Sequence, residues 1–282
     1  MPSKRLVFIV AFVIPIVGFV IIPFAVMYGR LDKGWMSLSN GIVYLTAAIL
    51  VAGAVSGVLW MVHHNSRKFL FRGDYPRALQ WARLLGPTGR HYRAAILCIA
   101  GRFQEAEEIY RRLNAKAHTP KARADALDSL GEVLTCQGRY EEAKLYLDEA
   151  IRLEPDQGGA CHDLAVWYLE QNLDPQAALV LIEQALSAQA GPARPFRLAS
   201  KAWALARLSF PVEARTAIDD AFRSADPLYL PGLASLHLYA GRACVAMSEI
   251  EGARQHFQQA ARLDATGHSG ATASRLLQSQ VT

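Results

Sequence analysis

The sequence is poor in the residues and motifs that build catalytic and metal centres. It has four cysteines in 282 residues, and no two of them form a Cys-x-x-Cys pair. A disulfide scaffold needs a higher density of cysteine, so this class is excluded. Phosphate-binding loops, Gly-x-Ser-x-Gly elbows and His-Glu-x-x-His helices are also missing. We therefore expect no metal, no cofactor and no enzymatic activity, because function has to be carried by a site.

Charge is absent from two long segments near the N-terminus. Residues 6–28 and 41–62 contain no Asp, Glu, Lys or Arg. Each is long enough to cross a bilayer as a helix, which takes about 20 apolar residues. A cleaved signal peptide is disfavoured because no Ala-x-Ala site follows the first segment and a second apolar segment comes at once. The sequence therefore predicts a two-span transmembrane hairpin over residues 1–62.

Basic residues flank this hairpin unevenly. Six Lys or Arg residues lie close outside the two spans, whereas the linker 29–40 holds two. Positive residues stay on the cytoplasmic side, so both termini and the domain that follows are expected in the cytoplasm. Arginine outnumbers lysine 23 to 7, which suggests a GC-rich bacterial genome. We therefore expect a multi-pass protein of a bacterial inner membrane.

The second span contains Gly53 and Gly57, four residues apart. Small residues at this spacing let two membrane helices approach closely. One interpretation is packing against the first span, which the frequency of this motif in membrane helices favours. The other is a docking face for another membrane subunit or a second copy of the chain.

The rest of the chain repeats one apolar pattern. An alanine is followed by apolar residues four and seven positions later, and this recurs six times. Such spacing places the three side chains on one face of a helix. About 12 residues before each leading alanine stands another small residue, which predicts a second helix that crosses the first closely. The leading alanines are Ala78, Ala106, Ala143, Ala178, Ala214 and Ala253, and the earlier small residues are Ser66, Ala94, Gly131, Ala165, Ala202 and Gly241.

The leading alanines are 28 to 39 residues apart, and this period resembles the tetratricopeptide repeat (TPR), a helix–turn–helix unit of about 34 residues. The segment 124–156 carries the resemblance most clearly. Its residues at the offsets of the family are Leu127, Leu130, Gly131, Leu134, Gly138, Tyr140, Ala143, Leu147, Ala150 and Pro155.

The resemblance extends over residues 59–263 and implies an all-α fold. We expect a TPR α-solenoid of about five to six helix pairs over residues 63–267, with a capping helix and tail at 268–282. Later copies depart from the family, because Asn172, Ser209 and Ser248 stand where it has glycine between the two helices. The geometry of these three turns is therefore left open.

The first solenoid helix is expected to begin inside the second membrane span. It would cover residues 59–71, and no Gly or Pro lies between Gly57 and Gly73. Because these two residues are the main helix breakers, the sequence predicts one continuous helix from the membrane into the first repeat.

Charge along the solenoid is dipolar. Residues 63–123 hold 13 basic and 4 acidic residues, whereas residues 124–190 hold 3 and 13. Anionic lipid headgroups would attract the basic block by about 1 kcal/mol per well-placed cation. An ordinary solvated helix surface explains the block equally well. Nucleic acid is disfavoured as a partner, because the basic residues lack interleaved aromatics and the acidic block would repel phosphate.

In the TPR family, the first helix of each pair lines a concave groove that binds partner proteins. Carried over by position, the resemblance implies an acidic middle and an aromatic far end with two arginines. We expect this groove to hold a peptide or helix with a basic part and an apolar part. The alternative for Trp203 is packing between adjacent repeats. The expected groove residues are Tyr92, Asp125, Asp128, Glu132, His162, Asp163, Phe196, Trp203, Arg207, Tyr239 and Arg242.

Some members of the family bind the acidic tails of chaperones with a clamp of Lys, Asn and Arg residues. Here Asp128 and Glu132 occupy the places of the first Lys and the Asn. Two carboxylates at these places would repel an acidic tail, so chaperone tails are disfavoured as partners.

Together these features predict a membrane-anchored TPR scaffold or adaptor that mediates protein–protein interaction, and an accessory subunit of a larger membrane complex is one form of it. The alternative is an assembly or quality-control factor that hands clients to a membrane machine, as in cytochrome c maturation or envelope biogenesis. A scaffold subunit should co-purify with its partner at fixed stoichiometry, whereas a client-handling factor should retain many substoichiometric proteins.

Overall fold

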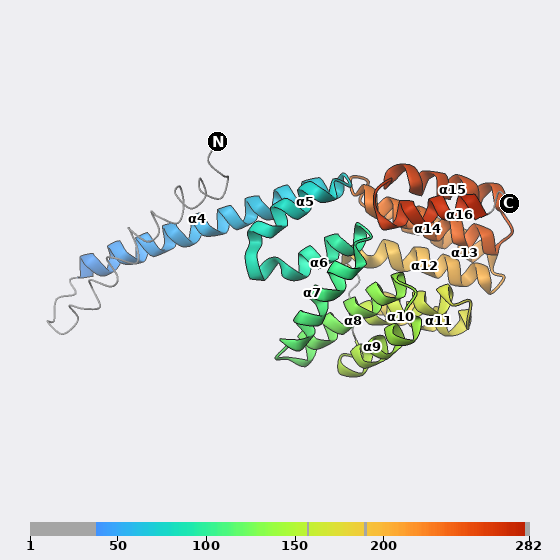
Figure 1. The fold of residues 1–282 in the computed structure, drawn as a ribbon, viewed down its shortest axis with the longest axis horizontal. Helices are drawn as coiled ribbons and strands as arrows, with labels where there is room; N and C mark the ends of the chain where they lie inside the picture. Colours follow the sequence, from blue (N-terminus) through green and yellow to red (C-terminus); the bar gives the residue numbers. More distant parts are fainter. Residues whose placement is uncertain (1–37, 157, 189–190, 280–282) are drawn as a thin grey trace. The chain divides into compact units, whose positions relative to one another are not determined.

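The computed structural model describes residues 38–156, 158–188 and 191–279, with the backbone alone for 38–45 (Figure 1). The chain divides into two compact units, residues 1–63 and 64–282. Every regular element in the described part is a helix. The expected all-α fold is thus confirmed for these residues.

Helix α4 (Leu38–Phe71) runs without interruption, so the prediction of one continuous helix between Gly57 and Gly73 is confirmed. It is the one helix of the described part that is long and apolar enough to cross a membrane, judged by length and composition. The stretch concerned is Thr46–Phe71, with a mean hydropathy of 1.8, and 6% of its apolar window is buried. The expected first span, 6–28, lies outside the described residues.

Helix pairs follow α4 along the chain (Figure 1). Helix α5 is the second helix of the first pair, and it is short. The 3-10 segment that follows it is interrupted at Gly86 (φ 61°, ψ −140°) and Pro87, so α5 cannot continue. This explains the 28-residue spacing of the first two leading alanines. The elements are α5 (Tyr75–Ala82), the 3-10 segment η4 (Arg83–Gly89), α6 (Arg90–Ile99), α7 (Phe103–Ala115), α8 (Pro120–Cys136), α9 (Tyr140–Leu153), α10 (Gly158–Glu170), α11 (Pro175–Ser187), η5 (Gly191–Ala193), α12 (Arg194–Arg207), α13 (Pro211–Arg223), α14 (Leu230–Ala246), α15 (Ile250–Leu263) and α16 (His268–Ser279).

The small residues predicted at the helix crossings are all buried. In the first pair, the Ser66 hydroxyl donates to the carbonyl oxygen of Ala78 at 2.8 Å. A Cβ atom at Gly131 would lie 2.4 Å from Leu147, and one at Gly241 would lie 2.4 Å from Phe257. Close helix approach therefore requires these residues to be small, as the repeat pattern indicated.

The three turns without glycine have the same backbone as those with it. Gly138 has a φ of 76°, and Asn172, Ser209 and Ser248 have φ values of 55°, 65° and 62°. The backbone N–H of the next residue bonds back to the preceding helix in each turn, as Phe210 does to Leu205 at 2.9 Å. This is the hydrogen bond of a Schellman turn, so the loss of glycine leaves the loop geometry unchanged.

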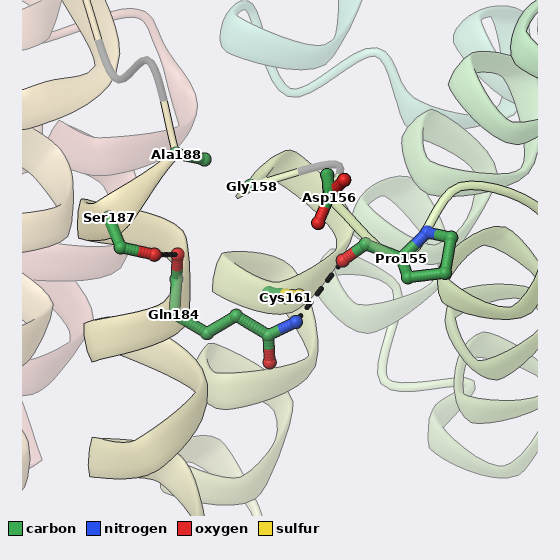
Figure 2. Close-up of a pocket in the computed structure, with 7 residues that line it drawn as sticks. All are labelled: Pro155, Asp156, Gly158, Cys161, Gln184, Ser187 and Ala188. Atoms are coloured by element: carbon green, nitrogen blue, oxygen red, sulfur yellow. Dashed lines mark hydrogen bonds between the residues drawn. The ribbon is translucent and has the colours of Figure 1, made fainter.

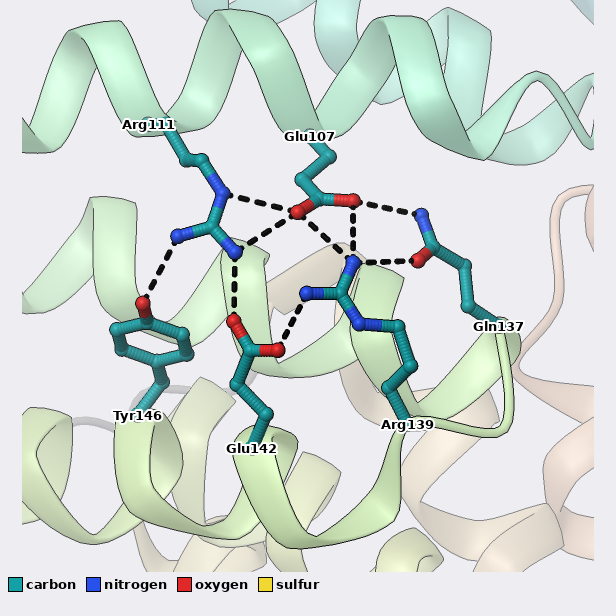
Figure 3. A network of polar contacts seen from close by, with 6 residues as sticks. All are labelled: Glu107, Arg111, Gln137, Arg139, Glu142 and Tyr146. Atoms are coloured by element: carbon teal, nitrogen blue, oxygen red, sulfur yellow. Dashed lines mark hydrogen bonds and ion pairs between the residues drawn. The ribbon is translucent and has the colours of Figure 1, made fainter.

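A polar network joins the second helices of two neighbouring pairs, α7 and α9 (Figure 3). Glu107 accepts hydrogen bonds from Arg111, Arg139 and Gln137. Arg111 also reaches Glu142 at 2.6 Å and the Tyr146 hydroxyl at 2.9 Å. The carboxylates thus alternate with guanidinium groups, and the network links these two repeats at their solvent-exposed surface.

The last helices of the solenoid contact the first ones. The Tyr75 hydroxyl donates to Asp264 at 2.5 Å, although 189 residues separate them. The rings of Phe103 and His268 lie 5.0 Å apart at their centroids. Helix α16 thus does more than cap α15, because its first residue also reaches the second pair. The repeat period alone gives no signal for this contact.

Candidate functional site

The residues expected to line the groove all lie on first helices of the pairs. They sit on α6 (Tyr92), α8 (Asp125, Asp128, Glu132), α10 (His162, Asp163), α12 (Phe196, Trp203, Arg207) and α14 (Tyr239, Arg242). Most are half-buried, whereas Glu132 is exposed and Trp203 is buried. The fold therefore places them in successive helices, and their side chains differ strongly in access to solvent.

The acidic middle carries less charge than its formula suggests. Asp128 and Asp163 lie on neighbouring first helices and are hydrogen-bonded to each other. Desolvation raises the pKa of Asp163 to about 7 and that of Asp128 well above its ordinary value. The two carboxyl groups therefore keep a proton near neutral pH, because burial disfavours two adjacent negative charges.

His162 lies beside these carboxyl groups. Its Nε2 is 3.0 Å from the Ser200 hydroxyl and its Nδ1 is 3.2 Å from Asp163. Burial, and then the charge of Arg197, lower the pKa of His162 to about 4. The imidazole is therefore neutral at physiological pH and serves as a hydrogen-bond partner between α10 and α12.

Arg197 is a residue of this region that the sequence did not single out. It is buried, and its Nη1 donates to the carbonyl oxygen of Ala185 at 2.5 Å. Its charge also acts on both Asp128 and Asp163. It lies on α12 directly after Phe196, at a position that the resemblance does not carry over to the groove, so the carried-over pattern could not find it.

The far end contains a stacked cluster of aromatic rings and arginine. Trp203 and Tyr239 stack with centroids 6.2 Å apart, and the Arg242 guanidinium lies 4.7 Å from the Trp203 ring. Arg242 also forms an ion pair with Glu170 at 2.5 Å. Trp203 is only 8% exposed and belongs to the core between α10 and α14. Most of the Trp203 side chain is therefore buried by packing between adjacent repeats, and only a small part of it is accessible to a partner.

A pocket of about 410 Å³ adjoins this cluster at the C-terminal ends of the first helices. Arg207 is held at its wall by hydrogen bonds to the carbonyl oxygens of Leu169 and Leu173, at 3.2 and 3.3 Å. Two guanidinium groups beside an apolar lining suit a carboxylate next to an apolar side chain. The lining residues are Asn172, Trp203, Arg207, Arg242, Val245, Ala246, Phe257 and Leu276.

Three of these lining residues were predicted as groove residues: Trp203, Arg207 and Arg242. The others were not, and two of them, Phe257 and Leu276, come from α15 and α16. Phe257 was identified only as a core residue of its repeat. The way α16 packs on α14 and α15 brings these residues to the pocket, and no sequence spacing encodes that.

A second, smaller cavity of about 280 Å³ lies between the start of α10 and the end of α11 (Figure 2). Figure 2 shows Gln184 bridging it by a hydrogen bond to the carbonyl oxygen of Pro155, at 3.1 Å. Burial raises the pKa of the Cys161 thiol in its wall, which keeps the thiol protonated and unreactive. This cavity offers no activated nucleophile from its lining.

Comparison with known proteins agrees with this fold. Residues 124–157 match the model of the tetratricopeptide repeat family. A stretch of 54 residues is 48% identical to protein O-mannosyl-transferase Tmtc2 of Drosophila melanogaster, covering 19% of this chain and 5% of that protein. These findings support the tetratricopeptide repeat family.

Among the solved structures that are similar to this chain are two that differ in coverage and TM-score. The APC/C hetero-tetramer Cut9–Hcn1 has a TM-score of 0.51 at 18% identity, with 69% of this chain and 36% of that chain covered. PilF of Pseudomonas aeruginosa has a TM-score of 0.44 at 21% identity, with 78% and 98% covered. At this identity the first likeness concerns the fold alone. The TPR fold is typically a non-catalytic scaffold for protein–protein interaction.

Proposed function

We propose that this protein is a membrane-anchored TPR scaffold that binds a segment of a partner protein and serves as an accessory subunit of a larger membrane complex. The observation that carries the proposal is the pocket beside Trp203, Arg207 and Arg242, because aromatic and arginine side chains are typical interface anchors. Helix α4 supports the anchoring by its length and apolar surface.

The side chains of the pocket and of the first helices indicate which kind of partner segment would bind. Arg242 is partly neutralised by Glu170, whereas Arg207 bonds only to backbone carbonyl oxygens among its described hydrogen bonds. The pocket therefore favours an apolar residue that carries or adjoins a carboxylate. Desolvation, and then the charge of Asp163, also raise the pKa of Glu132 well above its ordinary value, so Glu132 offers only a weak attraction to a basic residue further along the segment. Because Asp128 and Asp163 keep a proton, they add little to this attraction.

The anchoring has a finer form, in which two N-terminal spans form a hairpin and the solenoid lies in the cytoplasm of a bacterium. The excess of basic residues outside the two spans supports this orientation, and the basic block at 63–123 would then face anionic lipid. A reporter active only in the cytoplasm, fused after residue 282, should be active. Activity of a periplasmic reporter at the same place would reverse the topology.

The proposed function is tested by purification from the native membrane in mild detergent, with mass spectrometry of the bound proteins. We expect one or two membrane proteins at fixed stoichiometry. The variant Val245→Glu places a charge at the pocket and should lose them. The matched control Leu145→Glu, at an exposed site on α9, should retain them. Identical partners for both variants would contradict the proposal, and a scatter of weakly bound proteins would favour the client-handling alternative.

A further inference from the structure

The turns between first and second helices change character along the solenoid. In the first three pairs, the residue after the positive-φ glycine is charged: Asp74, Arg102 and Arg139. In the next two pairs this residue is apolar, and in the last pair it is Glu249, which is followed by an apolar residue; exposed apolar residues lie in or beside all three of these later turns. These residues, together called the turn edge, are Leu173 (47% exposed), Phe210 (48%), Val212 (68%), Val245 (38%) and Ile250 (58%).

The apolar turns exceed what their local structure requires. A residue at this point of a Schellman turn often packs back onto its own helix. Leu173 and Phe210 nevertheless leave about half of their surface in solvent, and Val212 and Ile250 leave more. Several large apolar side chains at successive turns of one end of a stack are typical of an interaction surface, whereas single exposed residues are not.

The turn edge adjoins the pocket at Leu173 and at Val245. Arg207 in the pocket donates to the carbonyl oxygen of Leu173, and Asn172 of the same turn lines the pocket. Val245 belongs to both. Arg215 of α13 pairs with Glu249 in the last turn, which joins the turns of α13 and α15. A partner that entered the pocket would therefore also cover the turn edge.

The turn edge itself presents the chemistry that the pocket selects. Twice along it an exposed apolar residue is followed directly by an exposed glutamate, at Val212–Glu213 and at Ile250–Glu251. The pocket offers an apolar lining with the guanidinium groups of Arg207 and Arg242. Each of these pairs places an apolar side chain next to a carboxylate on the turn edge. The pocket that could bind such a pair lies on the same side of the molecule. Such a surface is self-complementary, as a two-fold interface requires.

We propose that the pocket binds the turn edge of a second copy of this chain, so that two solenoids pair about a two-fold axis. The inference rests on the proposed function of the pocket and names the partner there. Each copy inserts the Val212–Glu213 or the Ile250–Glu251 corner into the pocket of the other, where the glutamate meets Arg207 and Arg242. Because both pockets are filled, the assembly closes as a dimer and does not extend into a filament.

Charge on the turn edge distinguishes this occupant from a lipid surface. Glu213, Glu249 and Glu251 lie among the exposed apolar residues. An anionic membrane would be repelled by these carboxylates, whereas the arginine pockets of a second copy would be attracted by them. In the proposed dimer, ion pairs between these glutamates and Arg207 and Arg242 would set how the two copies align.

The test is the mass of the full-length chain in detergent, measured by sedimentation equilibrium over a range of concentrations. We expect a monomer–dimer equilibrium in the wild type. The variants Val212→Ser with Ile250→Ser, and Glu213→Lys with Glu251→Lys, should each raise the dimer Kd at least about tenfold. All four sites are exposed, so the fold should persist, as circular dichroism would show.

The matched control variants change exposed apolar and acidic residues that lie outside the turn edge. Leu145→Ser with Val180→Ser removes exposed apolar residues of α9 and α11, and Asp219→Lys reverses an exposed charge on α13 itself. Both controls should dimerise like the wild type. A wild type that stays monomeric would overturn the inference. So would a dimer that Gly53→Leu with Gly57→Leu breaks and the turn-edge variants do not.

The proposed function can fail or stand separately from this inference. A monomeric wild type that retains another protein, lost in Val245→Glu, keeps the proposed function and overturns the second copy as occupant. If the turn-edge variants break the dimer and no other protein is retained, the second copy stands as the occupant of the pocket. The role of an accessory subunit is then ruled out.

Discussion

At the scale of single residues, the three turns without glycine store conformational strain. Ser209 and Ser248 adopt φ values of 65° and 62°, a region that costs an L-residue about 1 kcal/mol or more. We expect Ser209→Gly and Ser248→Gly each to stabilise the solenoid by about 0.5–1 kcal/mol in denaturant unfolding of the detergent-solubilised chain, since glycine adopts this region freely. Ser187→Gly, at a helical position, should not stabilise it. If Ser209→Gly and Ser248→Gly lower the stability, the two serines are not under conformational strain.

The carboxyl pair of α8 and α10 makes stability depend on pH. The pKa of Asp163 is about 7 in the folded chain and about 3.9 when unfolded. Below pH 4 the group is protonated in both states. As pH rises from about 4 to about 7 the unfolded state gains by ionising, so the folded state loses stability and the loss is complete above pH 7.

The variant Asp163→Asn should therefore match the wild type near pH 4 and exceed it in stability at pH 8. Thermal unfolding at both pH values measures this difference. Asp219→Asn, at an exposed site, should leave the pH profile unchanged. An Asp163→Asn variant that is less stable than the wild type at pH 8 would show that the ionised form of Asp163 is the favoured one.

At the scale of helices, close crossing explains which small residues the repeat needs. A Cβ at Gly131 would lie 2.4 Å from Leu147, whereas the nearest atom to a Cβ at Gly252 lies at 3.5 Å. Gly131→Ala should destabilise the chain by about 1–3 kcal/mol through overpacking. Gly252→Ala on α15 should stabilise it by about 0.5–1 kcal/mol, because alanine is the better helix former. Equal effects of the two changes on denaturant unfolding would refute this explanation.

Helix pairing is also the part of the fold that the sequence predicts well. Alanines such as Ala143 and glycines such as Gly131 are small because helices cross there, and that need is local to one repeat. The pocket is different. Phe257 and Leu276 reach it only through the packing of α15 and α16, and the shared proton of Asp128 and Asp163 depends on how two repeats stack. Period and spacing carry no information on such contacts between distant parts of the chain.

At the scale of the whole solenoid, contact between its two ends is a property of the assembled stack. The hydrogen bond from Tyr75 to Asp264 is buried and links helix α5 to the C-cap residue of α15. Tyr75→Phe leaves Asp264 without this donor and should cost about 1–3 kcal/mol. Hydrogen exchange should then rise in α5 and α16 together. Tyr146→Phe, which loses only the exposed bond from Arg111, should change neither. Faster exchange in α16 alone would contradict a contact that ties both ends.

On the function proposed above, another protein chain binds the pocket at the ends of α12 and α14. Site-specific photo-crosslinking in native membranes tests it most directly, with a photoreactive residue at position 245 in the pocket or at position 145 on α9. We expect one discrete protein adduct from position 245 and none from position 145, and the mass of the adduct separates a second copy from a different protein. The same result at both positions, or no adduct from position 245, would show that the pocket is not a protein-binding site.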